Sequence, residues 1–389
     1  MAIEIASPNA EARDDAEAAG LRYVSDGRPG FSRVKQGDAF VYRRSDGAPL
    51  TDPRHLARIK ALAIPPAWTD VWICPQANGH LQATGRDAKR RKQYRYHPDF
   101  RAMRDIAKFE HMMLFAQVLP TIRSTVEAHL GRRGMPREKV LATIVRLLET
   151  TLIRIGNDDY VTQNRSFGLT TLRNRHARVE GADIRFQFRG KSGKEWSLSL
   201  RNRRIANIIR RCQELPGQDL LQYTDEAGEP RGIDSSDVND YLREISGIDI
   251  STKDFRTWAG TVLAAAALGE CATFDSAIEA KRNIKAAIQK VAARLGNTPA
   301  VCRKCYIHPE ILSSYASGKL LGGLTEARKS KLCAELDQLQ GDEATVMAFL
   351  AGCDAGGADA PSRVKTPFDM GDKNPLARDD EGRRAQGSL

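Results

Sequence analysis

Four residues that lie far apart in the sequence, Arg154, Lys191, Arg256 and Tyr306, carry the side chains needed to break a phosphodiester bond. A tyrosine hydroxyl can attack a phosphate in line and hold it as a phosphotyrosine ester, which leaves a hydroxyl on the other fragment. Arginines suit the charge that develops on the phosphoryl oxygens, because a guanidinium is planar and permanently charged. A lysine can protonate the departing oxygen. This chemistry requires neither a metal nor a nucleotide, so we expect no cofactor.

The order and the neighbourhoods of these four residues resemble the type IB DNA topoisomerases, in the small poxvirus-type class that bacteria also have. The resemblance covers about residues 20 to 330, and Leu-x-Asn-x-His at 172–176 lies within it. None of the motifs is specific alone, but their combination is. The four local sequences are Ile153-Arg154-Ile155-Gly156, Arg189-Gly190-Lys191, Lys253-Asp254-Phe255-Arg256-Thr257 and Arg303-Lys304-Cys305-Tyr306.

The resemblance implies a role for each residue. Tyr306 is expected to be the nucleophile, and Arg154 and Arg256 to hold the phosphate in the transition state. Lys191, at the tip of a hairpin, is expected to be the general acid for the 5′-hydroxyl. Lys253 matches a family lysine at the same phosphate, one helical turn from Arg256. The implied activity is relaxation of supercoiled duplex DNA through a 3′-phosphotyrosine intermediate, without ATP or metal.

Two positions depart from the family pattern. Many members have a histidine nine residues before the tyrosine, and this chain has Asn297 there. Asparagine can still donate a hydrogen bond to a phosphate oxygen, but it carries no charge. Alternatively, Asn297 or Thr298 caps the helix that leads to Tyr306. A family lysine three residues after the first arginine is replaced by Asn157, which puts one contact in doubt.

A basic stretch at residues 85–96 mixes cations with aromatic residues, a composition that suits phosphate and base-edge contacts. Part of it resembles the family's DNA-contacting segment, which implies contacts from Arg91, Gln93, Tyr94 and Tyr96. Tyr160 matches a further family contact to phosphate. A solvated basic face remains the alternative for this stretch.

Each site residue also has an ordinary explanation when it is taken alone. Arg154 would stabilise a helix C-terminus, and Lys191 would be a solvated turn lysine. Arg256 would form a surface ion pair, and Tyr306 would be a half-buried core residue. Their joint occurrence in the family order favours the catalytic interpretation.

The composition favours a polyanionic partner. The chain has 389 residues with 60 Lys and Arg against 49 Asp and Glu, a net charge of +11, and a pI of about 9.4. We therefore expect duplex DNA as the partner of a monomeric clamp. The acidic start has no signal pattern and the apolar run at 263–268 is too short to span a membrane, so we expect a cytoplasmic, nucleoid-associated protein without membrane contact.

The seven cysteines predict free thiols, and Cys302 and Cys305 lack the partners of a zinc site.

The patterns predict an α+β fold with a small β-rich N-terminal domain and a larger, mainly helical catalytic domain that contains a hairpin. Residues 1–20 and 351–389 are expected to be disordered, residues 21–99 to form the α+β clamp domain, and residues 100–350 the catalytic domain. Strands are predicted at 40–42, 71–73 and 80–83, and a helix at 55–61.

Helical periodicity marks the catalytic region. An apolar stripe that includes Ile106 and Phe115 follows Phe100, and a helix at 138–153 is expected to stop at Gly156. A hairpin is predicted where 184–188 and 196–200 alternate around the turn at 190–193. Further helices are predicted at about 201–213, 236–246, 254–268, 273–294, from Pro299 to His308, and at 325–350.

Two other functions use similar residues. A tyrosine recombinase would resolve junctions formed from two DNA sites, but it typically has His-x-x-Arg where this chain has Lys253-x-x-Arg256, and an all-helical N-terminal domain. A non-catalytic DNA-binding protein would not need the intact set of four residues.

Overall fold

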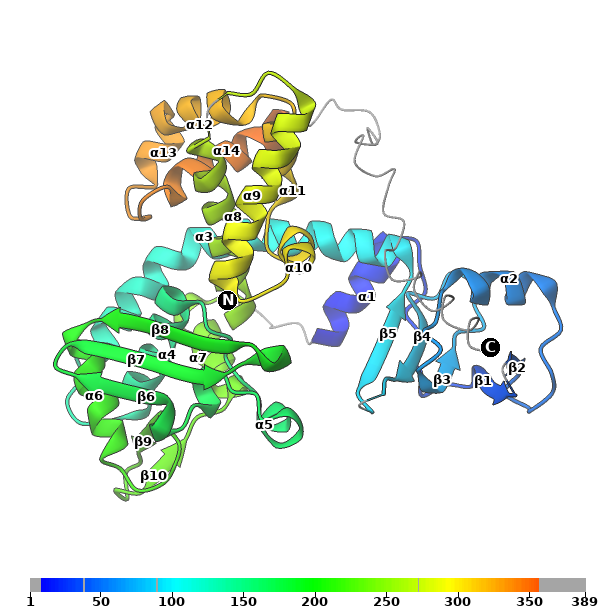
Figure 1. The fold of residues 1–389 in the computed structure, drawn as a ribbon, viewed down its shortest axis with the longest axis horizontal. Helices are drawn as coiled ribbons and strands as arrows, with labels where there is room; N and C mark the ends of the chain where they lie inside the picture. Colours follow the sequence, from blue (N-terminus) through cyan, green and yellow to red (C-terminus); the bar gives the residue numbers. More distant parts are fainter. Residues whose placement is uncertain (1–7, 38, 89, 272, 357–389) are drawn as a thin grey trace, which may run out of the picture.

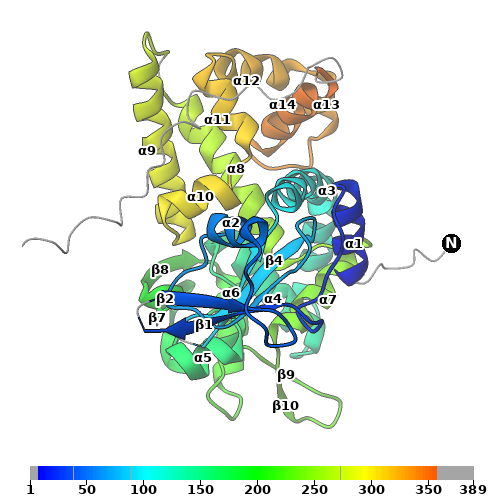
Figure 2. The same cartoon turned by 90° about the vertical axis from the view of Figure 1, so that its right-hand side faces the viewer.

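The computed structural model describes residues 8–37, 39–88, 90–271 and 273–356. Two lobes are joined by the long helix α3, Pro98–Leu130 (Figure 1). A lobe built on an antiparallel sheet precedes α3, and a larger, mostly helical lobe follows it. Seen from the side of the first sheet, the helices within residues 320–356 lie at one end of the molecule and the two short strands within residues 222–232 at the other (Figure 2). The predicted fold class is confirmed.

The first sheet has five strands in the order β2-β1-β3-β4-β5, and every neighbouring pair is antiparallel. Its inner face and helix α2, Pro53–Ala61, bury a small apolar core that includes Phe31, Ile59 and Ile73. The strands predicted at 40–42, 71–73 and 80–83 and the helix at 55–61 are confirmed. The strands are β1 Phe31–Gln36, β2 Ala39–Arg43, β3 Thr69–Ile73, β4 Leu81–Arg86 and β5 Lys92–Tyr96.

Helix α1, Pro8–Ala18, replaces the disorder predicted for residues 1–20. Ala16 is buried together with Leu21 and Phe100, and Asp15 forms an ion pair with Arg104 at 2.7 Å. The helix therefore packs on the first turns of α3, and the prediction of disorder was wrong from residue 8 onward. Residues 1–7 lie outside the described part of the chain.

Helices α3 and α4, Arg137–Thr151, form the centre of the large core. Phe115 is completely buried as the apolar stripe predicted, but Ile106 is 56% exposed, so its assignment to the stripe was wrong. Helix α4 ends earlier than predicted. Leu152 adopts a left-handed conformation with φ of 57°, and its N–H bonds to the carbonyl of Leu148. The predicted stop at Gly156 is therefore four residues too late.

The predicted hairpin is confirmed as β7, Asp183–Arg189, and β8, Glu195–Arg201. Their register places Phe188 opposite Trp196 and Phe186 opposite Leu198. A third strand, β6 Ala177–Glu180, pairs with β7 and was not predicted. Three further short elements surround this sheet: α6 Arg203–Gln213, which was predicted, β9 Gln222–Thr224 and β10 Pro230–Gly232.

The helices after this sheet match most of the predictions. They are α7 Ser235–Ser246, α8 Thr252–Gly269, α9 Ala277–Leu295, α10 Pro299–Cys305 and α11 Pro309–Ala316. The single helix predicted at 325–350 is wrong, because the chain forms α12 Leu320–Lys329, α13 Lys331–Glu335 and α14 Glu343–Gly356. Ser330 caps α13, and Gly341, with φ of 58°, turns the chain before α14. Since α14 reaches residue 356, the tail predicted from 351 starts too early, and residues 357–389 lie outside the described part.

Candidate active site

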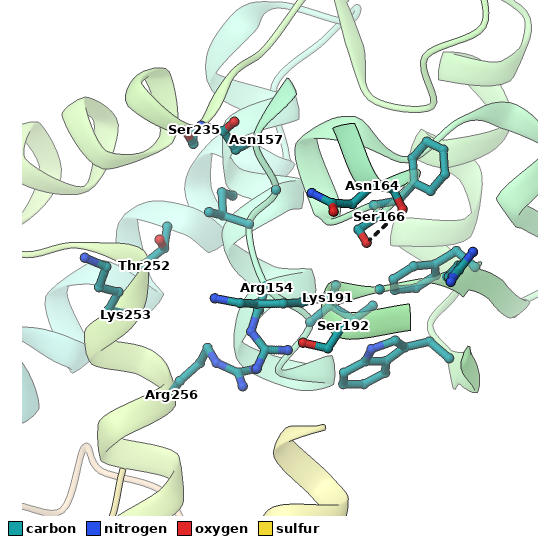
Figure 3. A pocket seen from close by; sticks show the side chains of 18 of the residues that line it. Arg154, Asn157, Asn164, Ser166, Lys191, Ser192, Ser235, Thr252, Lys253 and Arg256 are labelled. Carbon is teal, nitrogen blue, oxygen red and sulfur yellow. Dashed lines mark hydrogen bonds between the residues drawn. The ribbon is translucent and has the colours of Figure 1, made fainter. Parts of the chain in front are cut away.

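An open cavity of about 680 Å³ brings together residues from seven separate stretches of the sequence. Five of the predicted catalytic residues and one predicted DNA contact line it: Arg154, Lys191, Lys253, Arg256, Tyr306 and Arg91. In the close-up view, Arg154, Lys191 and Arg256 lie next to one another, and Lys253 lies to one side (Figure 3). Arg91 comes from the sheet lobe and the others from the helical lobe, so the cavity lies between the lobes.

The early end of α4 places Arg154. Beyond Leu152 the backbone is no longer helical, and the turn at residues 168–171 holds it in place. The N–H of Leu169 donates to the carbonyl of Arg154 at 2.9 Å, and the N–H of Thr170 donates to that of Ile155 at 2.7 Å. Gly156, with φ of 109°, allows the chain to pass Thr171 closely. Arg154 thus projects from a non-helical segment that is held by backbone hydrogen bonds, and not from a helix end.

Arg256 is fixed by backbone carbonyls. Its side chain is 3% exposed and donates to the carbonyl of Leu152 and, at 2.7 Å, to that of Leu295. These carbonyls lie at the C-terminal ends of α4 and α9, where the helix dipoles are negative and favour a cation. The Nε of Arg256 has no partner among the described residues. The two carbonyls therefore fix the orientation of the guanidinium, and its Nε–H remains able to donate a hydrogen bond.

Helix α8 starts directly before Lys253 and Arg256. Ser251 caps the helix, and Asp254 returns a bond to the Ser251 N–H at 2.8 Å. This reciprocal capping explains why the helix starts where it does. Lys253 is exposed toward the cavity while Arg256, one turn later, is buried.

Asn297 is tied to Arg154. Its Oδ1 accepts a hydrogen bond from Nη2 of Arg154, and the carbonyl of Gly296 accepts one from Nη1 at 3.5 Å. Burial lowers the pKa of Arg154, and the charge of Arg256 lowers that pKa further. Even so, an arginine stays charged at neutral pH. The two cations, Arg154 and Arg256, thus lie close together, and no contact among the described residues places a carboxylate between them.

Thr298, and not Asn297, caps α10. The Thr298 hydroxyl accepts from the N–H of Val301 at 3.3 Å, and Pro299 takes the first helical position. Nδ2 of Asn297 is buried and makes no hydrogen bond of normal geometry to a described residue. Asn297 therefore orients one arginine, and its side chain also lies within reach of the Cys302 thiol, whose pKa burial raises and this contact lowers in part.

Tyr306 follows the last turn of α10 and is half-buried. The Arg256 guanidinium carbon lies 5.2 Å from the centre of its ring. The Tyr306 backbone rests on α8: its carbonyl accepts from the Thr261 hydroxyl at 3.4 Å, and a Cβ on Gly260 would lie only 2.4 Å from the same oxygen. Close approach of two backbones, which only glycine permits, sets the position of the tyrosine.

Lys191 is exposed in the turn of the β7–β8 hairpin. The N–H of Gly190 donates to the carbonyl of Lys194 at 2.8 Å, and Ser192 and Gly193 have φ of 62° and 76°. The turn places Lys191 at the tip, as predicted, and Figure 3 shows its side chain beside Arg154.

The predicted DNA contacts of the sheet lobe are organised by an acidic residue that the sequence analysis did not single out. Asp87 accepts from Nη2 of Arg91 at 2.6 Å and from Nε2 of Gln93 at 3.0 Å. Tyr94 and Tyr96 are 46% and 37% exposed and stack with ring centres 6.0 Å apart. Of these residues only Arg91 lines the cavity.

Several cavity residues were missed by the sequence analysis. Trp196 was placed only as an apolar strand residue, and no motif marks Asn164, Ser166, Asn239 or Thr252. The side chain of Tyr160, a predicted contact in α5, Asp158–Asn164, lies outside the described part of the structure.

Among the described residues, no group of His, Cys, Asp and Glu side chains could hold a metal ion. Cys302 is buried and Cys305 partly buried, both as free thiols. None of the described helices is long and apolar enough to cross a membrane.

Residues 97–327 match the family described as eukaryotic DNA topoisomerase I, catalytic core, and residues 39–87 match the bacterial DNA topoisomerase IB N-terminal domain. DNA topoisomerase 1B of Acanthamoeba polyphaga mimivirus is 31% identical over 293 residues, which covers 74% of this chain and 87% of the viral protein. DNA topoisomerase 1B of Vaccinia virus and DNA topoisomerase I of Monkeypox virus are each 23% identical over 260 residues, 65% of this chain and 80% of theirs.

Proposed function

The chain belongs to the type IB DNA topoisomerases, and from this premise we propose that Tyr306 is the residue that attacks the DNA. The protein relaxes supercoiled duplex DNA by cutting one strand through a 3′-phosphotyrosine intermediate and resealing it. The family match leaves no support for the alternatives of a tyrosine recombinase or a non-catalytic DNA-binding protein.

The observation that carries the residue assignment is the convergence of Arg154, Lys191, Arg256 and Tyr306 on one cavity. They come from a loop, a hairpin turn, a helix and a helix end, and 152 residues of sequence separate the first from the last. Four unrelated surface residues would not share a cavity by their local structure alone. Their side chains are also those that a phosphoryl transfer from DNA to tyrosine requires.

In the forward step the Tyr306 hydroxyl loses its proton to water as its oxygen forms a bond to phosphorus and the bond from phosphorus to the 5′-oxygen breaks. Tyr306 recovers a proton from water when it leaves in the reverse step. Arg154 and Arg256 bind the non-bridging oxygens, where negative charge is concentrated. Nε of Arg256 and Nδ2 of Asn297 are suited to these oxygens, because neither donor makes a hydrogen bond of normal geometry to a described residue. A cation or a donor fixed in advance stabilises the transition state without reorganisation.

The proton for the 5′-oxygen comes from Lys191 as the bond breaks. Lys253, which faces the cavity one turn before Arg256, contacts the same phosphate. In the reverse step the 5′-hydroxyl returns its proton to Lys191 and attacks phosphorus, and Tyr306 leaves. Because the phosphotyrosine ester conserves the energy of the broken bond, the cycle needs neither ATP nor a metal ion.

Arg91 supports a clamp around the duplex. It belongs to the sheet lobe but lines the cavity of the helical lobe, so DNA at Tyr306 would be contacted from both sides. We place Gln93, Tyr94 and Tyr96 on the same DNA, because Asp87 orients Gln93 together with Arg91, and the two tyrosine rings are exposed beside them. Tyr160 is kept as a predicted phosphate contact. A monomer encloses DNA in this arrangement without a second copy, and its substrate places it at the nucleoid in the cytoplasm.

The test uses negatively and positively supercoiled plasmids in the presence of EDTA and without ATP. We expect the protein to relax both, and a denaturant quench to leave protein covalently bound to a 3′ DNA end, with Tyr306 in the linked peptide. Tyr306→Phe should lose relaxation and the covalent adduct while its affinity for DNA changes little. An adduct that persists in this variant, or that maps to another peptide, would move the nucleophile elsewhere.

A further inference from the structure

The indole of Trp196 fills the space between two turns that carry reacting groups. A Cβ placed on Gly190, in the hairpin turn, would lie 2.7 Å from Cδ1 and Nε1 of Trp196. A Cβ placed on Gly296, between α9 and α10, would lie 2.4 Å from Cζ2 at the opposite edge of the ring. The indole therefore touches both backbones where neither residue has a side chain.

Each of these glycines precedes a residue of the site. Lys191 follows Gly190, and Asn297 follows Gly296, whose carbonyl accepts from Arg154. Trp196 is thus in contact on one edge with the turn of the lysine and on the other with the turn that holds Arg154.

A second ring supports the indole. Phe188 lies opposite Trp196 in the β7–β8 pair and stacks on it, with ring centres 6.0 Å apart and planes within 3°. Stacking of this kind adds to the stability that comes from burying the rings. Trp196 is therefore braced by the hairpin itself while its edges contact the two turns, and it also lines the cavity.

We propose that Trp196 is a positioning residue that sets the distance between Lys191 and the Arg154–Asn297 pair, an inference that rests on the acid role proposed for Lys191. Lys191 and Ser192 are exposed at the tip of the hairpin, so they are not held by burial in the core. A flexible lysine must be placed to within a fraction of an ångström to protonate the 5′-oxygen as it leaves. The rigid, flat indole between two glycines provides that placement.

A substrate with sulfur in place of the bridging 5′-oxygen isolates this role. A thiolate leaves without a proton, because a thiol is far more acidic than an alcohol, so a poorly placed acid no longer limits the rate. The experiment compares single-turnover cleavage of two nicked duplexes that trap the covalent product, one with a 5′-oxygen and one with a 5′-sulfur at the cleaved linkage.

The variants are Trp196→Ala, Lys191→Ala and, as a matched control, Leu200→Ala. Leu200 is a half-buried residue on the same face of β8, four positions farther from the turn. We expect Trp196→Ala to slow cleavage of the oxygen substrate about 10- to 100-fold, within the range that general acids contribute, and to cleave the sulfur substrate at nearly the wild-type rate. Leu200→Ala should keep the wild-type ratio between the two substrates.

Equal slowing on both substrates, or no slowing, by Trp196→Ala would overturn the inference. If Lys191→Ala is itself not rescued by sulfur, the acid is another group, and the error lies in the proposed function. Rescue of Lys191→Ala without rescue of Trp196→Ala would refute the positioning role alone.

Gly190→Ala provides the same test without removing the indole. Gly190 has φ of −94° and ψ of −168°, which alanine adopts readily. Among the described residues Trp196 is the only close neighbour of the added methyl, since the next atom is 3.6 Å away. We expect a slowing of oxygen-substrate cleavage that sulfur rescues. The methyl should cost little more in a Trp196→Ala background, and full additivity of the two effects would refute the contact as the cause.

Discussion

Gly260→Ala tests whether the backbone contact between α8 and Tyr306 determines the rate of cleavage. The methyl group would lie 2.4 Å from the Tyr306 carbonyl oxygen and 3.1 Å from its Cβ, whereas ordinary contacts begin at 3.4 Å. Since Gly260 lies in the middle of a buried helix, the tyrosine segment must withdraw by about 1 Å. The Thr261 hydroxyl, which bonds to the Tyr306 carbonyl and to the N–H of His308, would lose its geometry as well.

The expected effect on catalysis is large and the effect on folding moderate. A displacement of about 1 Å at a reacting atom can lower a rate about 10²-fold. Overpacking of a core costs about 1–3 kcal/mol, and alanine recovers up to about 1 kcal/mol through its higher helix propensity. We therefore expect cleavage to fall about 100-fold while the free energy of unfolding falls by no more than about 2 kcal/mol.

The assay measures single-turnover formation of the covalent adduct, with thermal unfolding and DNA affinity measured in parallel. Gly269→Ala is the matched control, because it lies in the same helix and, within the described part of the chain, its methyl would meet only Cδ1 of Leu324 at 3.9 Å. It should cleave at the wild-type rate. A folded, DNA-binding Gly260→Ala protein that forms adduct within about twofold of wild type would refute the reasoning from backbone contact to tyrosine placement.

Three other predictions concern Asn297, His111 and Arg91. Asn297→Ala should slow cleavage about 100-fold by removing a donor near the phosphate, and Asn297→His, which restores a donor, should recover most of the rate; a full rate in the alanine variant would exclude the contact. The hydrogen bond to Asp254 and the charge of that carboxylate raise the pKa of His111 above 6.5, although burial lowers it. The pair therefore stabilises the fold fully below pH 6.5, and this stabilisation is lost as the pH rises through the raised pKa. The difference in Tm between wild type and His111→Gln should shrink over the same rise in pH, and a constant difference would contradict the pairing. Arg91→Ala should reduce the slope of log Kd against log salt by about 1, and an unchanged slope would remove Arg91 from the phosphates.

The parts of the fold that the sequence predicts best are those in which local pattern and tertiary environment agree. Phe186 and Phe188 alternate with polar residues, and the strand they form has one buried face. The glycines and Lys191 between the two alternating stretches mark the turn correctly. Pattern predicts structure there because the period of two belongs to one face of a sheet.

Other features depend on contacts that no local pattern records. Leu152 takes a left-handed conformation that its residue type disfavours. Glycine is the residue that a helix stop usually favours, so the sequence places the stop at Gly156, four residues too late. Asn297 and Thr298 are both good caps by type, and only the bond from Arg154 to Asn297 separates their roles. Helix α1 has a polar sequence with one buried alanine, and it is ordered by Phe100 and Arg104 of α3.

The candidate site divides in the same way. A distant resemblance is enough to predict the candidate residues Arg154, Lys191, Arg256 and Tyr306 from the sequence alone. The residues that support them are visible only in three dimensions. Gly260 and Trp196 carry no reactive group, and their contribution lies in the space they leave or fill.

The way Arg256 is held also bears on how freely this enzyme can change over evolution. Its guanidinium is anchored by the main-chain oxygens of Leu152 and Leu295, and every amino acid supplies such an oxygen. Side chains at those two positions can therefore drift without unmaking the anchor, as long as the two helices still terminate where they do. Insertions or deletions that shift either terminus would be far more harmful than most point substitutions, and lineages of this enzyme should tolerate divergence in residue type better than divergence in helix length.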